Sequence, residues 1–312
     1  MPKASLRENQ KTEIAFPLKT QTKAYFYALT AILFWSTMGT AFKLTLGFMD
    51  PPVLLLLSST TALLFLGITL IVSGKHKYLK GLGIRQWLNS ALMGLFNPFL
   101  YYMVLFKAYS MIPAQEAVAL NYIWPVMLVV FSILFLKQKM GLMSIVAILV
   151  SFSGTLVIVT HGEFSSFRFG NPLGTLLATG SSIFWASFFV LNMKDKREAY
   201  SKMFLNFFFG LVYILAWNLF AGTMKIPAIH GLAGAIYIGI FEMGLTFVLW
   251  LTALNLSSNT ARVSNLVYLS PFLSLMMVSI FVGEKILIST IIGLMIIVGG
   301  ILLQQWSFYM GK

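Results

Sequence analysis

The sequence has no cysteine, little histidine and little charge. Its 312 residues include no Cys, three His and nine Asp and Glu, and charged residues make up 10% of the chain. The lack of Cys excludes disulfides, thiolate metal sites and cysteine nucleophiles. The three His lie far apart in predicted loops, which argues against a histidine metal site. A soluble domain carries roughly 25% charged residues, so the composition also argues against a soluble fold.

Long apolar runs fill most of the chain instead. Hydrophobic residues make up 58% of the sequence, and the mean hydropathy is +0.85. A membrane-spanning helix needs about 20 apolar residues. Ten runs of this kind are predicted to be transmembrane helices: 24–46, 52–73, 87–108, 114–136, 141–160, 172–193, 203–222, 231–254, 260–282 and 286–306. We therefore expect an all-α membrane protein, because the short connections leave no room for a soluble domain.

The basic residues lie mainly on alternate connections. The net charge of +13 could suggest nucleic acid, but Lys and Arg fall in short loops between apolar runs. With the N-terminus in the cytoplasm, 16 of the 22 Lys and Arg fall on the cytoplasmic side, as the positive-inside rule predicts. We expect cytoplasmic termini, a retained tail at 1–23 rather than a signal peptide, and no nucleic-acid partner.

The chain repeats itself at half its length. Tyr122-Ile-Trp-Pro125 is matched 146 positions later by Tyr268-Leu-Ser-Pro271, and two further pairs keep that spacing. These pairs are Lys139 with Lys285 and Gly154 with Gly300. An internal repeat in a sequence of membrane-spanning helices is typical of transporters whose substrate site lies near the middle of the bilayer.

An odd number of spans in each half fixes how the two halves are related. Five spans per half mean that the second half enters the membrane from the opposite face. The sequence thus predicts two inverted five-helix repeats, 24–160 and 172–306, around a central cavity. A linker at 161–171 and a cytoplasmic tail at 307–312 complete the predicted organisation.

Polar residues inside the predicted spans are the candidate substrate-binding groups, because a polar group in the bilayer usually faces a cavity or a partner. Glu242 lies in the middle of the eighth span, with Thr246 one turn further on. At the equivalent depth of the third span lie Asn97 and, one turn on, Tyr101. Two roles stay open for Glu242. Its carboxyl group could contact the substrate, or it could be neutral and make a structural hydrogen bond.

Three prolines are candidate hinges. Pro98, Pro125 and Pro271 each remove a backbone donor from a predicted span. Each frees the carbonyl four residues back, which needs water, a side chain or a substrate in a membrane. For Pro125 and Pro271 these carbonyls belong to Asn121 and Val267.

Aromatic side chains gather near these points. An apolar ring face with a polar edge suits an aromatic or aliphatic amino acid, or an organic cation. The remaining predicted substrate-binding residues are Tyr102, Asn121, Tyr122, Trp124, Trp185, Asn265 and Tyr268.

Two charged residues near span ends stay ambiguous at this stage. Arg262 precedes Asn265 by one turn and could attract a carboxylate or reach lipid headgroups. Glu116 lies in the first turn of a predicted helix, where a carboxylate favours the helix dipole. The two carboxylates within spans, Glu116 and Glu242, are predicted at opposite depths and make a poor acid/base pair. We therefore expect no enzymatic activity, no catalytic residue, no metal and no cofactor.

The chain resembles the drug/metabolite transporter superfamily, EamA type, over about residues 24–306. Trp35-Ser-Thr-Met38 and Asn121-Tyr-Ile-Trp-Pro125 resemble the aromatic amino-acid exporters of that superfamily. The resemblance implies ten spans, a bacterial inner-membrane location and outward passage of neutral and aromatic amino acids. It also implies that Tyr122, Trp124 and Trp185 line a central cavity.

The favoured hypothesis is a transporter that exports neutral or aromatic amino acids by alternating access. Efflux of organic cations with Glu242 as counter-charge is the first alternative, and a membrane scaffold without transport is the second. The expected partners are a small-molecule substrate and the lipid bilayer, with protons as a candidate coupling ion. The expected state is a monomer or a weak dimer.

Overall fold

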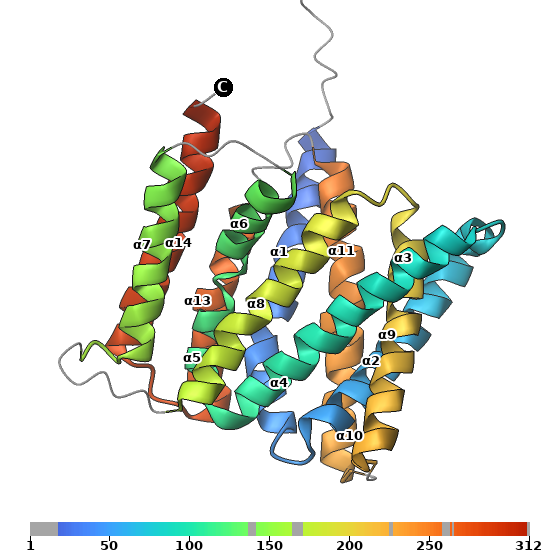
Figure 1. The fold of residues 1–312 in the computed structure, drawn as a ribbon, viewed down its shortest axis with the longest axis horizontal. Helices are drawn as coiled ribbons and strands as arrows, with labels where there is room; N and C mark the ends of the chain where they lie inside the picture. The colour runs from blue at the N-terminus through green and yellow to red at the C-terminus, as the bar shows by residue number, and fades with distance from the viewer. Residues whose placement is uncertain are drawn as a thin grey trace, which may run out of the picture.

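The computed structural model describes residues 18–136, 142–163, 171–224, 227–257, 263 and 265–310. Those residues are almost entirely helical and include no strand (Figure 1). Within these described residues, six helical segments are long and apolar enough to cross a membrane: Pro51–Val72, Ile84–Met111, Ala114–Phe131, Pro172–Met193, Ala199–Ala221 and Ile229–Leu256. Shorter apolar helices lie at Ile145–Val159, Leu266–Val282 and Ile288–Leu303. The predicted class, an all-helical membrane protein, is thus confirmed.

The first half of the chain contains seven labelled α-helices. They are α1 (Leu18–Thr45), α2 (Pro51–Val72), α3 (Ile84–Gly94), α4 (Tyr101–Met111), α5 (Ala114–Asn121), α6 (Trp124–Leu136) and α7 (Leu142–Val159). A 3₁₀ turn, η1 (Lys75–Leu79), follows α2, and a π-helical stretch, η2 (Leu95–Leu100), joins α3 to α4.

The second half repeats this order. Its helices are α8 (Pro172–Met193), α9 (Ala199–Ala221), α10 (Ile229–Tyr237), α11 (Thr246–Leu256), α13 (Ser270–Met277) and α14 (Ile288–Met310). The π-helical stretch η3 (Ile238–Leu245) joins α10 to α11. A 3₁₀ turn, η4 (Leu266–Leu269), precedes α13, and a second π-helical stretch, η5 (Val278–Val282), follows it.

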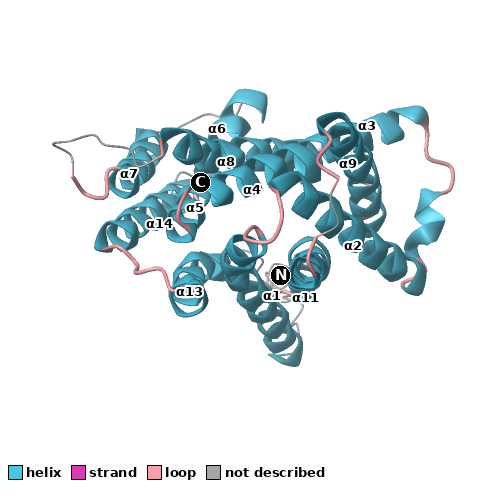
Figure 2. Cartoon of the chain, turned by 90° about the horizontal axis from the view of Figure 1, so that it is seen from below, coloured by secondary structure: helices cyan, strands magenta, loops and turns pink. Residues whose placement is uncertain are grey.

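The helices surround a centre formed by both halves. Seen from below, α4 and α8 lie on one side of this centre and α1, α11 and α13 on the other (Figure 2). Contacts between the halves include α4 with α8, α1 with α11, α1 with α13 and α6 with α8. The start of α1 and the end of α14 lie at the same end of the bundle, at the top of Figure 1.

Two helices form a closely packed pair at one edge of the bundle. A Cβ added to Gly154 on α7 would lie 2.5 Å from the carbonyl oxygen of Gly293 on α14. A Cβ added to Gly300 would lie 2.8 Å from the carbonyl oxygen of Ala147. Small residues of this kind let membrane helices approach backbone to backbone, so the two repeat-matched glycines hold α7 against α14.

Spans three and eight are each interrupted midway. In η2, Pro98 has no N–H to donate, and Asn97 leaves the helical region with φ −146° and ψ 119°. In η3 there is no proline. The Thr246 hydroxyl instead donates to the Phe241 carbonyl, five residues back, and satisfies a carbonyl in the π-helical stretch. The proline predicts the first interruption, whereas nothing in the sequence predicts the second.

Spans four and nine are also discontinuous. A turn at Tyr122 and Ile123 separates α5 from α6, and η4 precedes α13. Pro125 and Pro271 are the second residues of α6 and α13. A missing N–H costs little in the first turn of a helix, because that donor has no intrahelical partner. The prolines thus lie where a new helix begins and do not kink a continuous one.

Candidate substrate cavity

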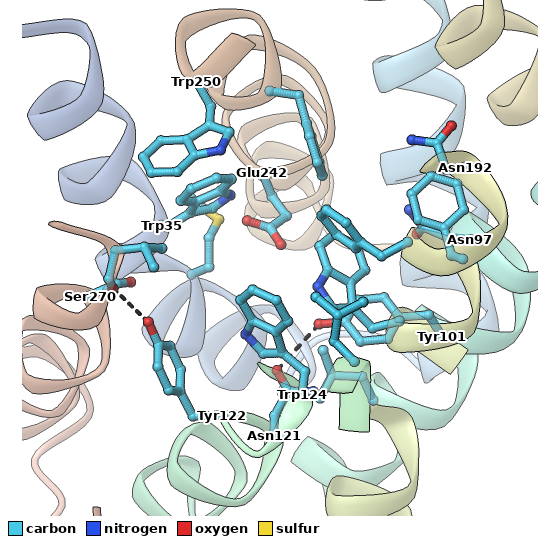
Figure 3. A pocket seen from close by; sticks show the side chains of 18 of the residues that line it. Trp35, Asn97, Tyr101, Asn121, Tyr122, Trp124, Asn192, Glu242, Trp250 and Ser270 are labelled. Atoms are coloured by element: carbon cyan, nitrogen blue, oxygen red, sulfur yellow. Dashed lines mark hydrogen bonds between the residues drawn. The ribbon is translucent and has the colours of Figure 1, made fainter. Parts of the chain in front are cut away.

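A cavity of about 510 Å³ lies between the two halves of the chain (Figure 3). Its wall is formed by α1, η2, α4, α5, α6, α8, α9, η3, α11, η4 and α13. Sites for small molecules are typically concave, mostly apolar and roughly 300–1,000 Å³ in volume. The cavity therefore has room for a ligand the size of an aromatic amino acid.

Most of the residues that the sequence singles out line this cavity. The predicted residues on its wall are Asn97, Tyr101, Asn121, Tyr122, Trp124, Trp185, Glu242, Tyr268 and Pro271. Whether they contact a substrate stays a prediction. The sequence analysis did not select several other lining residues, among them Trp35, Phe188, Phe189, Asn192, Lys202, Asn206, Phe247 and Trp250. The match of Trp35 to Trp185 across the repeat is a signal that could have found one of them.

The structure does not place five predicted residues on the cavity wall. Tyr102 and Thr246 are fully buried and bonded to neighbouring groups. Asn265 is exposed. Pro98 and Pro125 pack inside the bundle, where Pro98 lies against the backbone of Gly210. Arg262 lies outside the described residues.

Aromatic rings form much of the cavity wall. Trp35 and Trp250 lie together on one side, with ring centroids 5.3 Å apart (Figure 3). Trp185 lies 4.8 Å from Tyr101, and Trp124 stacks on Phe189 at 5.8 Å. Offset and edge-to-face arrangements of this kind are the favoured aromatic geometries. The wall can hold a flat ring or a cation by contact with ring faces.

Glu242 projects from η3 toward the middle of the cavity (Figure 3). Its Oε1 accepts a hydrogen bond of 3.0 Å from the hydroxyl of Tyr102 on α4. Its Oε2 is buried and has no hydrogen-bond partner among the described residues. The side chain of Tyr102, one of the predicted substrate-binding residues, thus lies behind Glu242 and positions its carboxyl group.

Carboxamides supply most of the remaining polar surface. Both ends of the Asn121 amide are hydrogen-bonded, because Oδ1 accepts from Tyr101 at 3.3 Å and Nδ2 donates to Ser181 at 2.8 Å. The Oδ1 atoms of Asn97, Asn192 and Asn206 are buried without a partner in the described part of the chain. A buried acceptor without a donor is costly, so a ligand that donates hydrogen bonds would stabilise this wall.

One hydrogen bond joins the two discontinuous spans. The hydroxyl of Tyr122, beside the break in span four, donates to the carbonyl oxygen of Val267 in span nine at 2.6 Å. Val267 is four residues before Pro271, the position at which the sequence predicts a free carbonyl. This carbonyl also accepts the backbone N–H of Ser270, so it has a backbone donor from its own half of the chain and a side-chain donor from the other half.

The cavity ends at a layer of buried side chains near the C-terminal end of α4. Phe42 packs against Phe106 at 4.9 Å and Tyr109 at 5.3 Å. Lys43 Nζ donates to the carbonyl oxygens of Tyr109 at 3.0 Å and Ile112 at 2.8 Å. These contacts tie α1 to the end of α4 and close this end of the cavity.

Beyond this layer, the start of α5 is bonded to the loop before α14. Glu284 accepts from the backbone N–H groups of Ala114 at 2.8 Å and Gln115 at 3.1 Å. The side chain of Gln115 donates to the carbonyl oxygen of Lys285 at 2.9 Å. A carboxylate at a helix N-terminus satisfies otherwise unpaired N–H groups, so this network joins the two halves at the closed end.

The other end of the cavity reaches the connection between α8 and α9. Asn192 and Lys202 line it there, and Lys202 Nζ donates to the carbonyl oxygens of Asn192 at 3.4 Å and Asp195 at 2.9 Å. Arg197 bonds Asp195 at 2.6 Å and the Ser90 hydroxyl of α3 at 2.9 Å. Burial raises the pKa of Asp195, but the hydrogen bonds and charge of Arg197 outweigh it and hold the pKa below its ordinary value.

A bundle of this kind, with an apolar cavity between two sets of apolar helices, is an architecture typical of membrane transporters. In the described part of the chain no three His, Cys, Asp or Glu side chains form a group that could hold a metal ion. Residues 22–160 and 172–304 match the EamA-like transporter family. These two segments cover most of the sequence, so the chain belongs to that family.

Relatives with curated descriptions are also transporters. The chain is 26% identical to an uncharacterized transporter, YvbV of Bacillus subtilis, over 70% of this chain and 71% of that protein. It is 24% identical to an uncharacterized transporter of Clostridium kluyveri, and that match covers 91% of this chain and 94% of the relative. It is 26% identical to the aromatic amino acid exporter YddG of Ancylobacter novellus, over only 57% of this chain and 61% of the exporter.

A solved crystal structure resembles the fold as a whole. Its TM-score to this chain is 0.63, at 20% sequence identity, and the match covers 91% of this chain and 98% of the other. At this identity the likeness shows the fold alone.

Proposed function

We propose that this transporter exports neutral and aromatic amino acids through the cavity between its two halves. The observation that carries the proposal is the aromatic wall made by Trp35, Trp124, Trp185 and Trp250. Ring faces on both sides of a cavity suit a ligand with a flat apolar body. The description of the relative YddG as an aromatic amino acid exporter supports the same substrate class.

Alternating access between two inverted five-helix repeats, 24–160 and 172–306, is the mechanism that we propose. In support, the contacts between elements come in matched pairs: η2 packs on α9 as η3 packs on α2, and α6 packs on α8 as α13 packs on α1. The two family matches divide the chain near the same place. Two related halves of opposite orientation can exchange conformations and so open the cavity to either side.

The proposed location is a bacterial inner membrane, with ten membrane spans and both termini in the cytoplasm. The described relatives are bacterial, and the loop charges support this orientation. The cavity would then be closed toward the outside, at Phe42 and Tyr109, and reach the cytoplasmic connection of α8 and α9. Tails at 1–23 and 307–312 and a linker at 161–171 complete this arrangement.

Exchange of labelled substrate in proteoliposomes tests the proposed function. The purified full chain is reconstituted with unlabelled tryptophan inside, and entry of labelled tryptophan, phenylalanine and threonine is followed. We expect exchange of the two aromatic amino acids above protein-free vesicles, with threonine slower. No exchange of any amino acid would contradict the proposal.

Efflux of organic cations is the second candidate function. It is favoured by the single carboxylate, Glu242, among the described cavity-lining residues, and by the tryptophans around it. A quaternary ammonium compound in the same exchange assay separates the candidates, because it offers charge without an amino acid backbone. Transport of that cation in the absence of amino-acid exchange would favour this alternative.

Coupling to protons stays a prediction. The carboxyl group of Glu242 accepts a hydrogen bond from the hydroxyl of Tyr102, and a carboxyl group ordinarily gives up its proton far more readily than a phenol does. Glu242 is therefore the candidate proton carrier among the described cavity-lining residues. If transport is coupled, Glu242→Gln is expected to abolish its dependence on an imposed pH gradient.

A further inference from the structure

The carboxyl group of Glu242 has no basic partner in the described structure. Its one recorded hydrogen bond comes from Tyr102 and uses Oε1, which leaves Oε2 buried and unpaired. The residue is 9% exposed and lies on the cavity wall. A buried carboxylate is costly unless it is paired, so the site is incomplete without a further donor or cation.

The cavity itself does not supply that cation from the residues described. Lys202 is the one basic residue among the described lining residues. Its Nζ is bonded to the carbonyl oxygens of Asn192 and Asp195, at the connection between α8 and α9. Lys202 is thus held at the end of the cavity and does not pair with Glu242.

The rest of the polar wall also lacks donors for its acceptors. Asn97 and Asn206 each carry a buried amide oxygen without a partner in the described residues. Both are 2% exposed, and they lie on neighbouring elements, since η2 packs on α9. A ligand that brings N–H groups would satisfy acceptors on more than one wall.

The apolar surroundings of Glu242 limit what kind of donor fits. Phe247 lies 6.0 Å from both Trp35 and Trp185 by ring centroids, and all three rings line the cavity. Rings of this kind favour a cation with an apolar or aromatic body. A hard metal cation prefers several oxygen ligands, whereas Glu242 is the one carboxylate among the described lining residues, and no group of three His, Cys, Asp or Glu that could hold a metal ion occurs in the described part of the chain.

We propose that Glu242 is the ammonium-binding group of the substrate site. A protonated amine of the ligand pairs with the Glu242 carboxylate, and the body of the ligand lies against the tryptophan walls. The ligand class is that of small amines with an aromatic or apolar body, which includes amino acids and their decarboxylated amines. This inference rests on the proposed function, because it assigns a role within the same cavity.

Binding of three matched indoles tests the ammonium site. Dissociation constants of tryptophan, tryptamine and 3-indolepropionate are measured for the full chain in lipid nanodiscs, with wild type and Glu242→Gln. The three share one ring, and 3-indolepropionate lacks only the amine of tryptophan. We expect Glu242→Gln to raise the dissociation constants of tryptophan and tryptamine at least about tenfold, a loss typical of a charged hydrogen bond. The dissociation constant of 3-indolepropionate should change less than about twofold or should fall.

Two further variants serve as controls. Glu116→Gln makes the same chemical change at a buried carboxyl that bonds His161 outside the cavity lining, and it should leave the three constants unchanged. Glu242→Asp keeps the charge and should retain more amine binding than Glu242→Gln. If Glu242→Gln does not fold, Glu242→Asp decides instead: weaker binding of tryptophan and tryptamine relative to 3-indolepropionate supports the site, because the shorter side chain moves the carboxylate away from the amine. An equal loss of binding of all three indoles in the aspartate variant overturns the ammonium site.

The outcomes separate this inference from the proposed function. An equal change for all three indoles, or no change in any of them, overturns the ammonium site while leaving tryptophan transport intact. Preferential loss of tryptophan and tryptamine supports it. A wild-type protein that binds none of the three and exchanges no amino acid overturns the proposed function and this inference together.

Discussion

Spans three and eight both depart from a regular α-helix midway, but by different backbone geometry. Asn97 in span three has an extended backbone conformation, whereas span eight stays helical through η3. In span three the π-helical stretch η2 contains Asn97 and Pro98, and in span eight η3 contains Glu242 and no proline. A glycine precedes each polar residue by three positions, Gly94 in one span and Gly239 in the other. Each glycine packs against a helix of the other half: Gly94 against α9, and Gly239 against α2.

The comparison separates what builds the cavity from what selects its ligand. The departure from the α-helix does not depend on proline, because η3 contains none and the backbone contact at the glycine occurs in both spans. The polar side chain three residues after the glycine differs, an amide in one span and a carboxylate in the other. We infer that the scaffold is shared by the halves, whereas charge recognition belongs to span eight alone.

Filling either glycine should cause the largest effect. A Cβ at Gly94 would lie 2.4 Å from the carbonyl oxygen of Asn206, and one at Gly239 would lie 2.4 Å from that of Ser58. Backbone atoms cannot move aside cheaply, and overpacking typically costs about 1–3 kcal/mol. Gly94→Ala and Gly239→Ala should each lower the thermal unfolding midpoint in detergent by several degrees and reduce folded yield.

Gly180→Ala is the matched control for these substitutions. A Cβ at this position, also within a helix, meets nothing within 4 Å. Alanine is favoured over glycine in a helix by roughly 0.5–1 kcal/mol, so the midpoint should stay or rise. If Gly94→Ala were harmless while Gly239→Ala unfolded the protein, the two interruptions would not share one scaffold.

Truncating the tryptophan walls should have an intermediate effect. Trp124→Ala removes stacking on Phe189, and Trp185→Ala removes contacts with Tyr101 and Phe189. An aromatic contact contributes roughly 0.5–1.5 kcal/mol beyond buried area. Exchange of labelled tryptophan should fall about two- to tenfold more than exchange of threonine. An equal loss for both substrates would indicate a damaged gate or fold and not a lost ring contact.

The smallest expected effect concerns the connection beside the cavity end. Asp195→Asn removes the charge that Arg197 pairs with, at side chains only 5% and 12% exposed. Because the pKa of Asp195 is lowered in the folded protein, the stabilisation is present above its ordinary value of 3.8 and is lost as pH falls through the lowered pKa. Wild type should unfold about 1–4 °C above the variant at pH 7.

That difference should shrink below about pH 4, as wild-type Asp195 itself becomes protonated. Unfolding midpoints of both proteins at pH 7, 5, 4 and 3 check this. A difference that persists unchanged at pH 3 would show that the charge of Asp195 does not provide the stabilisation.

Sequence reasoning predicted the helical class and much of the cavity wall. Apolar runs of membrane length mark the helices, and repeat-matched polar residues such as Asn97 and Glu242 do reach one cavity. Pro98 also indicated the break in the third predicted span, whereas the spacing of Gly154 and Gly300 indicated the repeat and not the contact between α7 and α14. These features depend on local composition and on spacing, which a single sequence carries.

The remaining features depend on direction and on tertiary packing. Thr246 follows Glu242 by one turn, but the hydroxyl of Thr246 bonds the Phe241 carbonyl of the π-helical stretch η3 and does not line the cavity. Tyr102 adjoins Tyr101 in the chain yet lies behind the wall as the donor to Glu242. Asn206 lies in an apolar run without a motif and reaches the cavity only because α9 packs beside η2. None of these directions can be read from the order of residues alone.

Moving the carboxylate from one span to the other tests the central claim most directly. The measurement is the ratio of tryptamine to 3-indolepropionate binding in nanodiscs for wild type, Glu242→Asn and the double variant Asn97→Glu/Glu242→Asn. If positions 97 and 242 face one shared site and the charge alone selects amines, Glu242→Asn should lower this ratio at least about tenfold. The double variant should then recover most of it. A folded double variant that binds tryptamine no better than Glu242→Asn would contradict the account, because the two positions would not face one shared site.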